Sequence, residues 1–179
     1  MIKLNTIQAY LLFLIIIFAA SCKDDKKIIT DNDYGQFRNP LLEVNKGLVK
    51  KDADRIKKFC SRRNWEMQVS ERGLFYQIYE HGNGDSARKE RFATLEYRVE
   101  LLDGTICYTS DSLGPMKFRI GKGGVESGLE EGIMMLREGD KARFILPPYM
   151  AHGLIGDEFR IPPRSIIVYD VELLNISDN

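Results

Sequence analysis

The feature that most constrains this chain is a pattern that begins at Leu74. Short runs of aromatic and aliphatic residues are separated there by turns rich in glycine, asparagine and proline. Such runs predict β-strands, and Asp103-Gly104 between two of them predicts a tight antiparallel turn. The strands are expected at residues 74–79, 94–102, 105–109, 116–120, 141–146 and 165–176.

One segment inside this region has helical spacing instead. Its apolar residues recur every three or four positions, which predicts a short amphipathic helix that ends before Gly139-Asp140. One short helix among several antiparallel strands predicts an α+β domain. The apolar residues of this helix are Val125, Leu129, Ile133 and Leu136.

Composition restricts the function classes. The chain has 179 residues, of which 44% are hydrophobic and 29% charged, so it can form one globular domain with an ordinary core. Its 26 basic side chains balance 26 acidic ones without any long run of one sign, which argues against a nucleic-acid partner. Three cysteines and two histidines are scattered without the spacing of a zinc site, so no metal is expected.

Residues 1–21 have the form of a signal peptide, because a short apolar run is too brief to cross a bilayer as a helix. The run ends in Ala19-Ala20-Ser21-Cys22, which resembles a bacterial lipobox and predicts a lipid on Cys22. The alternative is ordinary secretion without lipidation. Residues 22–39 are expected to form a flexible tether. Lys23-Asp24-Asp25 resembles a surface-export signal of Bacteroidetes lipoproteins, so the cell surface and the periplasmic face of the outer membrane both remain open.

A helix is predicted over residues 40–63, within a helical extension of residues 40–70. Asn39-Pro40 is typical of a helix start, and an apolar stripe ends at Cys60. This helix is expected to pack on the following domain, to self-associate or to bind an envelope partner. Cys60 and Cys107 could form a disulfide after export, although we expect two free thiols.

The domain at residues 71–179 contains seven further motifs: DGTICYTS (103–110), FRIGKGGV (118–125), SGLEEGI (127–133), GDKARFILPP (139–148), AHG (151–153), IPP (161–163) and VYDVELL (168–174). Together these motifs resemble the FKBP family of peptidyl-prolyl isomerases. The resemblance implies a twisted antiparallel sheet wrapped around one short helix, here preceded by an N-terminal helix, with no cofactor. Together with the N-terminal features, it suggests a Bacteroidetes-like lipoprotein form, similar to members associated with gliding motility.

The resemblance also implies a pocket for proline-containing polypeptide segments. Tyr97, His152 and Tyr169 stand at catalytic positions, and His152 replaces a tyrosine that donates a hydrogen bond. The backbone N–H of Glu126 is expected to donate a second one. The other implied substrate-binding residues are Cys107, Tyr108, Met116, Val125, Leu129 and Ile161.

Four of these residues depart from the family pattern, which suggests weak catalysis and poor macrolide binding. Cys107 and Met116 replace aromatic residues, Tyr108 replaces an aspartate, and Leu129 replaces the tryptophan of the pocket floor. Three functions therefore remain open: an isomerase that assists the folding of exported or surface proteins, a non-catalytic module that binds proline segments, and a scaffold of an envelope machine such as a gliding apparatus.

Overall fold

The computed structural model describes the backbone of residues 31–178 and the side chains of residues 42–178. The predicted signal peptide and the lipidation site at Cys22 lie outside the described residues. By compactness the chain divides into two units, one up to Glu43 and one from Val44 onward. No helix among residues 31–178 combines the length and the apolar character needed to cross a bilayer.

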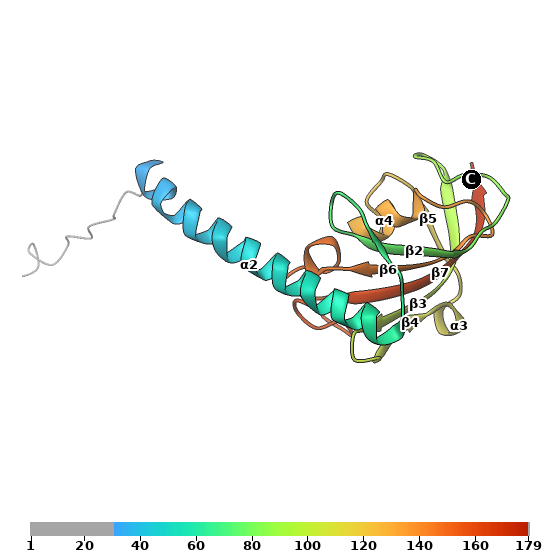
Figure 1. The fold of residues 1–179 in the computed structure, drawn as a ribbon. Helices are drawn as coiled ribbons and strands as arrows, with labels where there is room; N and C mark the ends of the chain where they lie inside the picture. The colour runs from blue at the N-terminus through green and yellow to red at the C-terminus, as the bar shows by residue number, and fades with distance from the viewer. Residues whose placement is uncertain (1–30, 179) are drawn as a thin grey trace, which may run out of the picture. The chain divides into compact units, whose positions relative to one another are not determined.

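The second unit contains one antiparallel sheet of seven strands, in the order β1-β2-β6-β7-β3-β4, with β5 paired to β3 (Figure 1). Every pairing is antiparallel, and the longest runs between β3 and β7. The strands are β1 (Gln68–Val69), β2 (Phe75–Glu80), β3 (Phe92–Leu101), β4 (Ile106–Thr109), β5 (Met116–Arg119), β6 (Lys141–Leu146) and β7 (Ile167–Ser177). The predicted α+β class is confirmed.

Three short helices complete this unit: α3 (Ser110–Leu113), α4 (Ser127–Ile133) and the 3-10 turn η1 (Pro148–Met150). The amphipathic helix predicted near residues 125–136 is α4. It is shorter than its apolar pattern, because Val125 precedes the helix and Leu136 follows it. The turn at α3 had no signal in the sequence, and neither did β1, which lies within the range assigned to the helical extension.

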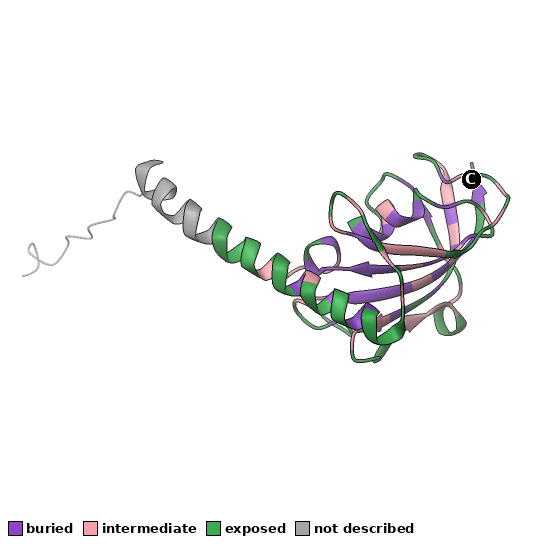
Figure 2. Cartoon of the chain, viewed as in Figure 1, coloured by how far each residue is buried: buried purple, intermediate pink, exposed green. Residues whose placement is uncertain are grey.

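The N-terminal helix α2 (Asp31–Arg63) begins earlier than residue 40, so the capping role predicted for Asn39-Pro40 is wrong. Residues 31–39 of the predicted tether are helical as well. The helix continues through Pro40, although an interior proline lacks an N–H donor and crowds the carbonyl of the fourth residue before it. Most of the described side chains of α2 are exposed (Figure 2). Val44 and Val49 are among these exposed side chains. Binding of a partner to this part of α2 stays a prediction.

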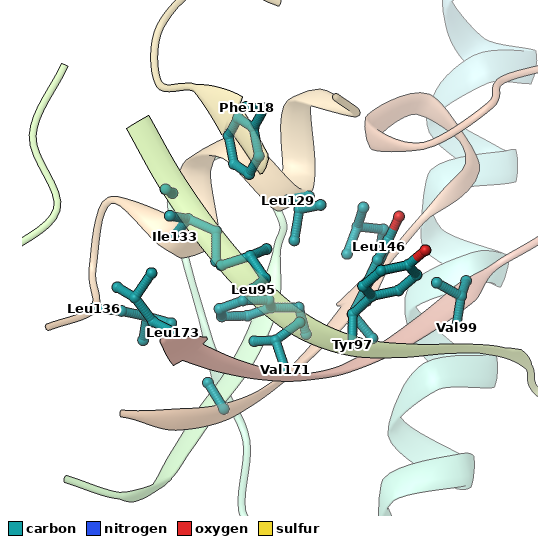
Figure 3. Close-up of a cluster of buried hydrophobic side chains, with 14 of the residues drawn as sticks. Leu95, Tyr97, Val99, Phe118, Leu129, Ile133, Leu136, Leu146, Val171 and Leu173 are labelled. Carbon is teal, nitrogen blue, oxygen red and sulfur yellow. The ribbon is translucent and has the colours of Figure 1, made fainter. Parts of the chain in front are cut away.

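Two hydrophobic clusters lie on opposite faces of the sheet. Side chains alternate between the faces of a strand, so Phe144 and Tyr169 join the large cluster around α4, whereas Ile145 and Val168 join the other. Figure 3 shows Leu129 and Ile133 extending from α4 toward the strands in the large cluster. The last turns of α2 cover the other face, through Ile56, Phe59 and Cys60. Both Cys60 and Cys107 are free thiols, as expected.

Candidate functional site

A cleft of about 310 Å³ opens between the sheet, the start of α4 and the loop that follows β6. Strand β3 contributes Tyr97 and β7 contributes Tyr169, both on the face that carries α4. The full lining is Tyr97, Val99, Tyr108, Leu113, Met116, Glu126, His152, Asp157 and Tyr169. A second hollow of about 480 Å³ adjoins it, because the two share Met116, Glu126 and His152.

The structure places some of the sequence-predicted residues elsewhere. Val125 lines the adjoining hollow. Cys107, Leu129 and Ile161 are 1%, 0% and 3% exposed and belong to the core beneath the cleft. None of these three residues lines the cleft or the adjoining hollow, and their contact with a substrate stays a prediction. Leu129 points from α4 into the core (Figure 3).

The sequence did not predict three of the residues that line the cleft. Val99 lies two positions after Tyr97 on β3, and the two-residue period of a strand could have identified it. Leu113 belongs to α3, which the sequence did not signal. Asp157 lies in the long loop between β6 and β7, where no periodic pattern exists to assign it.

The carboxylate of Glu126 is the centre of a polar network inside the cleft. Glu126 lies immediately before α4, and its Oε1 is 2.8 Å from Nε2 of His152. The hydroxyl of Tyr169 donates to both carboxylate oxygens, at 3.0 and 3.1 Å. Burial, followed by the neighbouring Glu126, raises the pKa of Tyr169 well above its ordinary value, so this hydroxyl stays protonated.

A second carboxylate closes the other side of the cleft. Asp157 Oδ1 accepts the backbone N–H groups of Phe159, Arg160 and Ile161 at 2.9, 2.9 and 2.7 Å, and Oδ2 accepts the hydroxyl of Tyr108. Burial raises the pKa of Asp157, but these donors outweigh it and lower the pKa to about 2. The hydrogen bond from the Tyr108 hydroxyl to Asp157 raises the pKa of Tyr108 to about 12. The carboxylate thus holds the loop in a fixed conformation and remains ionised.

The backbone N–H of Glu126 donates no hydrogen bond within the described part of the chain. It therefore has no competing acceptor in that part of the chain, and its bond to a substrate carbonyl oxygen stays a prediction. Among residues 42–178, no three His, Cys, Asp or Glu side chains gather in a way that could hold a metal ion. What the cleft offers is an apolar wall with hydrogen-bond donors beside it.

A strongly curved antiparallel sheet around one short helix, with a part-apolar cleft at the start of that helix, defines the class of FKBP-like domains. The family model for the FKBP-type peptidyl-prolyl cis-trans isomerases matches residues 84–174. This chain belongs to that family.

Individual relatives support the assignment. FKBP-type peptidyl-prolyl cis-trans isomerase FkpA of Escherichia coli is 35% identical over 111 residues, which is 62% of this chain and 40% of that protein. The matched sequence therefore spans 40% of the length of that relative. Peptidyl-prolyl cis-trans isomerase Fkbp12 of Drosophila melanogaster is 40% identical over 97 residues, which is 53% of this chain and 90% of that protein.

Solved structures agree with the fold. The crystal structure of FkpA from Escherichia coli matches with a TM-score of 0.60 at 29% identity. The match covers 95% of this chain and 81% of the FkpA chain. The crystal structure of AtFKBP13 matches with a TM-score of 0.60 at 30% identity, over 62% of this chain and 98% of the AtFKBP13 chain.

Proposed function

We propose that this chain is an active peptidyl-prolyl cis-trans isomerase that acts on proline-containing segments of exported or surface proteins. One observation carries the proposal. The cleft of about 310 Å³ has an apolar wall made by Tyr97, Val99 and Met116, and the backbone N–H of Glu126 beside it donates no hydrogen bond within the described residues. An X-Pro segment presents the complementary pair of a proline ring and a preceding carbonyl oxygen.

The chemistry requires no nucleophile. Rotation about an X-Pro bond has a barrier of about 18–20 kcal/mol because it breaks amide resonance, while the two isomers differ by only about 0.5–1 kcal/mol. The twisted amide is less polar than the planar one. An apolar wall that excludes water therefore favours the transition state over the ground state. Tyr97 and Met116 exclude water, and the Glu126 N–H holds the carbonyl oxygen.

We also propose that the protein works at the outer membrane, held there by a lipid on Cys22. The support is the small-residue stretch before this cysteine and the polar sequence after it. Two or three acyl chains, each contributing about 0.8 kcal/mol per buried methylene, would anchor a domain of this size. Similarity to lipoproteins associated with gliding motility is part of the same proposal, and so is the side of the membrane.

A second candidate is a module that binds proline segments without useful turnover. It is favoured by the two acidic side chains in the cleft, since Glu126 and Asp157 make the wall more polar than the mechanism requires. The burial of Leu129 in the core also favours this candidate, because no large side chain of α4 then contacts the proline ring at the floor of the cleft.

The test measures refolding of a model protein whose slow phase is a prolyl isomerisation, with catalytic amounts of the full chain. We expect acceleration proportional to concentration. Met116→Ala removes part of the cleft wall, whereas Met134→Ala makes the same change at a side chain outside it that is 41% exposed. The first should lower kcat/KM about tenfold, which corresponds to roughly 1.4 kcal/mol of lost apolar contact. The second should leave it unchanged.

A folded protein that gives no acceleration would overturn the catalytic proposal. In that case a fluorescent proline peptide decides the second candidate. Binding weakened by Met116→Ala but not by Met134→Ala would support it, and absence of binding would exclude both functions.

A further inference from the structure

The three residues of the polar network each come from a different part of the sequence. Glu126 precedes α4, His152 lies in the loop after β6, and Tyr169 lies in β7. All three line the cleft. The side chain of Glu126 is only 14% exposed and that of His152 26% exposed, so their contact is largely shielded from water. Such shielding strengthens an electrostatic interaction.

The network determines which nitrogen of His152 is available to a substrate. Because Nε2 lies 2.8 Å from the Glu126 carboxylate, it must carry a proton and donate it there. That leaves Nδ1, which has no hydrogen-bond partner in the described part of the chain. In a neutral imidazole whose Nε2 is protonated, Nδ1 is an acceptor. It becomes a donor only when the ring is protonated.

We propose that Glu126 is a positioning residue that makes His152 a proton-dependent hydrogen-bond donor to the carbonyl oxygen of the substrate. The proposal rests on the proposed isomerase function. A carbonyl oxygen cannot bond to the lone pair of Nδ1, but it can accept Nδ1–H of the imidazolium. The Glu126 carboxylate balances the positive charge of that form. Activity should therefore increase as the pH falls through the range in which histidine titrates.

Other charged and titratable groups around His152 do not take over this role. Asp157, from the same loop, is occupied by Tyr108 and by three backbone N–H groups. The Tyr169 and Tyr108 hydroxyls remain protonated, since their pKa values are raised. The remaining groups that line the cleft or the adjoining hollow, or flank them, are Tyr97 on β3, Lys117 on β5 and Arg160, whose guanidinium lies over the Tyr108 ring.

The experiment has two readouts on the full chain between pH 5.5 and 8.5. The first is kcat/KM for a proline peptide. The second is the imidazole ¹⁵N spectrum, which is simple because the chain has two histidines. Wild type should show the Nε2–H tautomer when neutral and should gain about fivefold in kcat/KM on protonation, the factor expected for one added hydrogen bond.

Three variants provide the comparison. Glu126→Gln keeps an acceptor for Nε2–H and for the Tyr169 hydroxyl but removes the charge that balances the imidazolium, so the gain in kcat/KM at low pH should be smaller. Glu158→Gln makes the same change at an exposed residue of the same loop that has no hydrogen bond or ion pair with His152, and should leave both readouts unchanged. His152→Tyr, which supplies a hydroxyl donor, should give a flat profile.

An active wild type with a flat profile would overturn the inference, and so would an unchanged profile in Glu126→Gln or a neutral Nδ1–H tautomer. Inactivity at every pH would overturn the proposed function, together with the catalytic part of this inference. The two failures are thus distinguishable, because an enzyme that is active but independent of pH refutes only the role of Glu126.

Discussion

Gly132 of α4 should be essential for stability, because it allows the helix to approach the sheet closely. A Cβ atom at this position would lie 2.7–2.8 Å from three carbons of the Phe144 ring. Carbon atoms in contact normally lie about 3.5–4.0 Å apart. Phe144 is fully buried in β6, so its ring has no room to move aside.

The cost of Gly132→Ala follows from two opposing effects. Overpacking a core costs about 1–3 kcal/mol, and three simultaneous close contacts place this site at the upper end. Alanine regains about 1 kcal/mol of helix propensity relative to glycine. The expected net loss is about 2 kcal/mol, which corresponds to a decrease in Tm of roughly 6–10 °C for a domain of this size.

The matched control is Gly47→Ala in α2, where an added Cβ would meet nothing within 4 Å. The same substitution there should leave the free energy of unfolding unchanged or raise it by up to about 1 kcal/mol. Urea unfolding can be followed by the fluorescence of Trp65, the single tryptophan, whose ring contacts Phe59 at a centroid distance of 5.6 Å. A Gly132→Ala variant as stable as wild type would show that α4 does not rest on Phe144 as described.

Three further outcomes are expected. Asp52→Asn should lower the free energy of unfolding by about 1–3 kcal/mol in urea melts, since Asp52 is buried 2.6 Å from Arg164 and the arginine keeps some access to water. Because the pKa of Asp157 is lowered to about 2, its stabilising effect is complete above about pH 4 and is lost as the pH falls toward 2. Acid titrations of Asp157→Asn should lack that loss, and an unchanged acid profile would refute it. Cys60 and Cys107 should react with a thiol reagent only after unfolding, because burial raises the pKa of both thiols.

The sequence was sufficient to predict six of the seven strands, because alternation and turn residues act locally. β6 has the predicted bounds, and β2 differs from its prediction by one residue at each end. The start of α2 could not be predicted in the same way. Pro40 favours a helix start only on average, and here it lies inside a helix that begins at Asp31.

Leu129 illustrates a different limit. Its position in the motif was identified correctly, but the direction of its side chain depends on how α4 lies against the sheet. Gly128 and Gly132 flank it at close approaches to Leu146 and Phe144. With the helix held so near the sheet, Leu129 is enclosed in the core rather than exposed in the cleft. A pattern of residue types does not contain that distance.

The polar network is formed by residues far apart in the sequence, and the presence of the donors accounts for that of the acceptor. A shielded carboxylate such as that of Glu126 is costly unless donors surround it. The hydroxyl of Tyr169 and the Nε2–H of His152 provide those donors. The resemblance implies a tyrosine at the position of His152, so His152 alone looks like a minor departure from the family pattern. Glu126, His152 and Tyr169 together place a polar network in a partly apolar cleft. The activity of this cleft should therefore depend on these three residues as a unit, and replacing one of them will not restore the behaviour of the more typical family pocket.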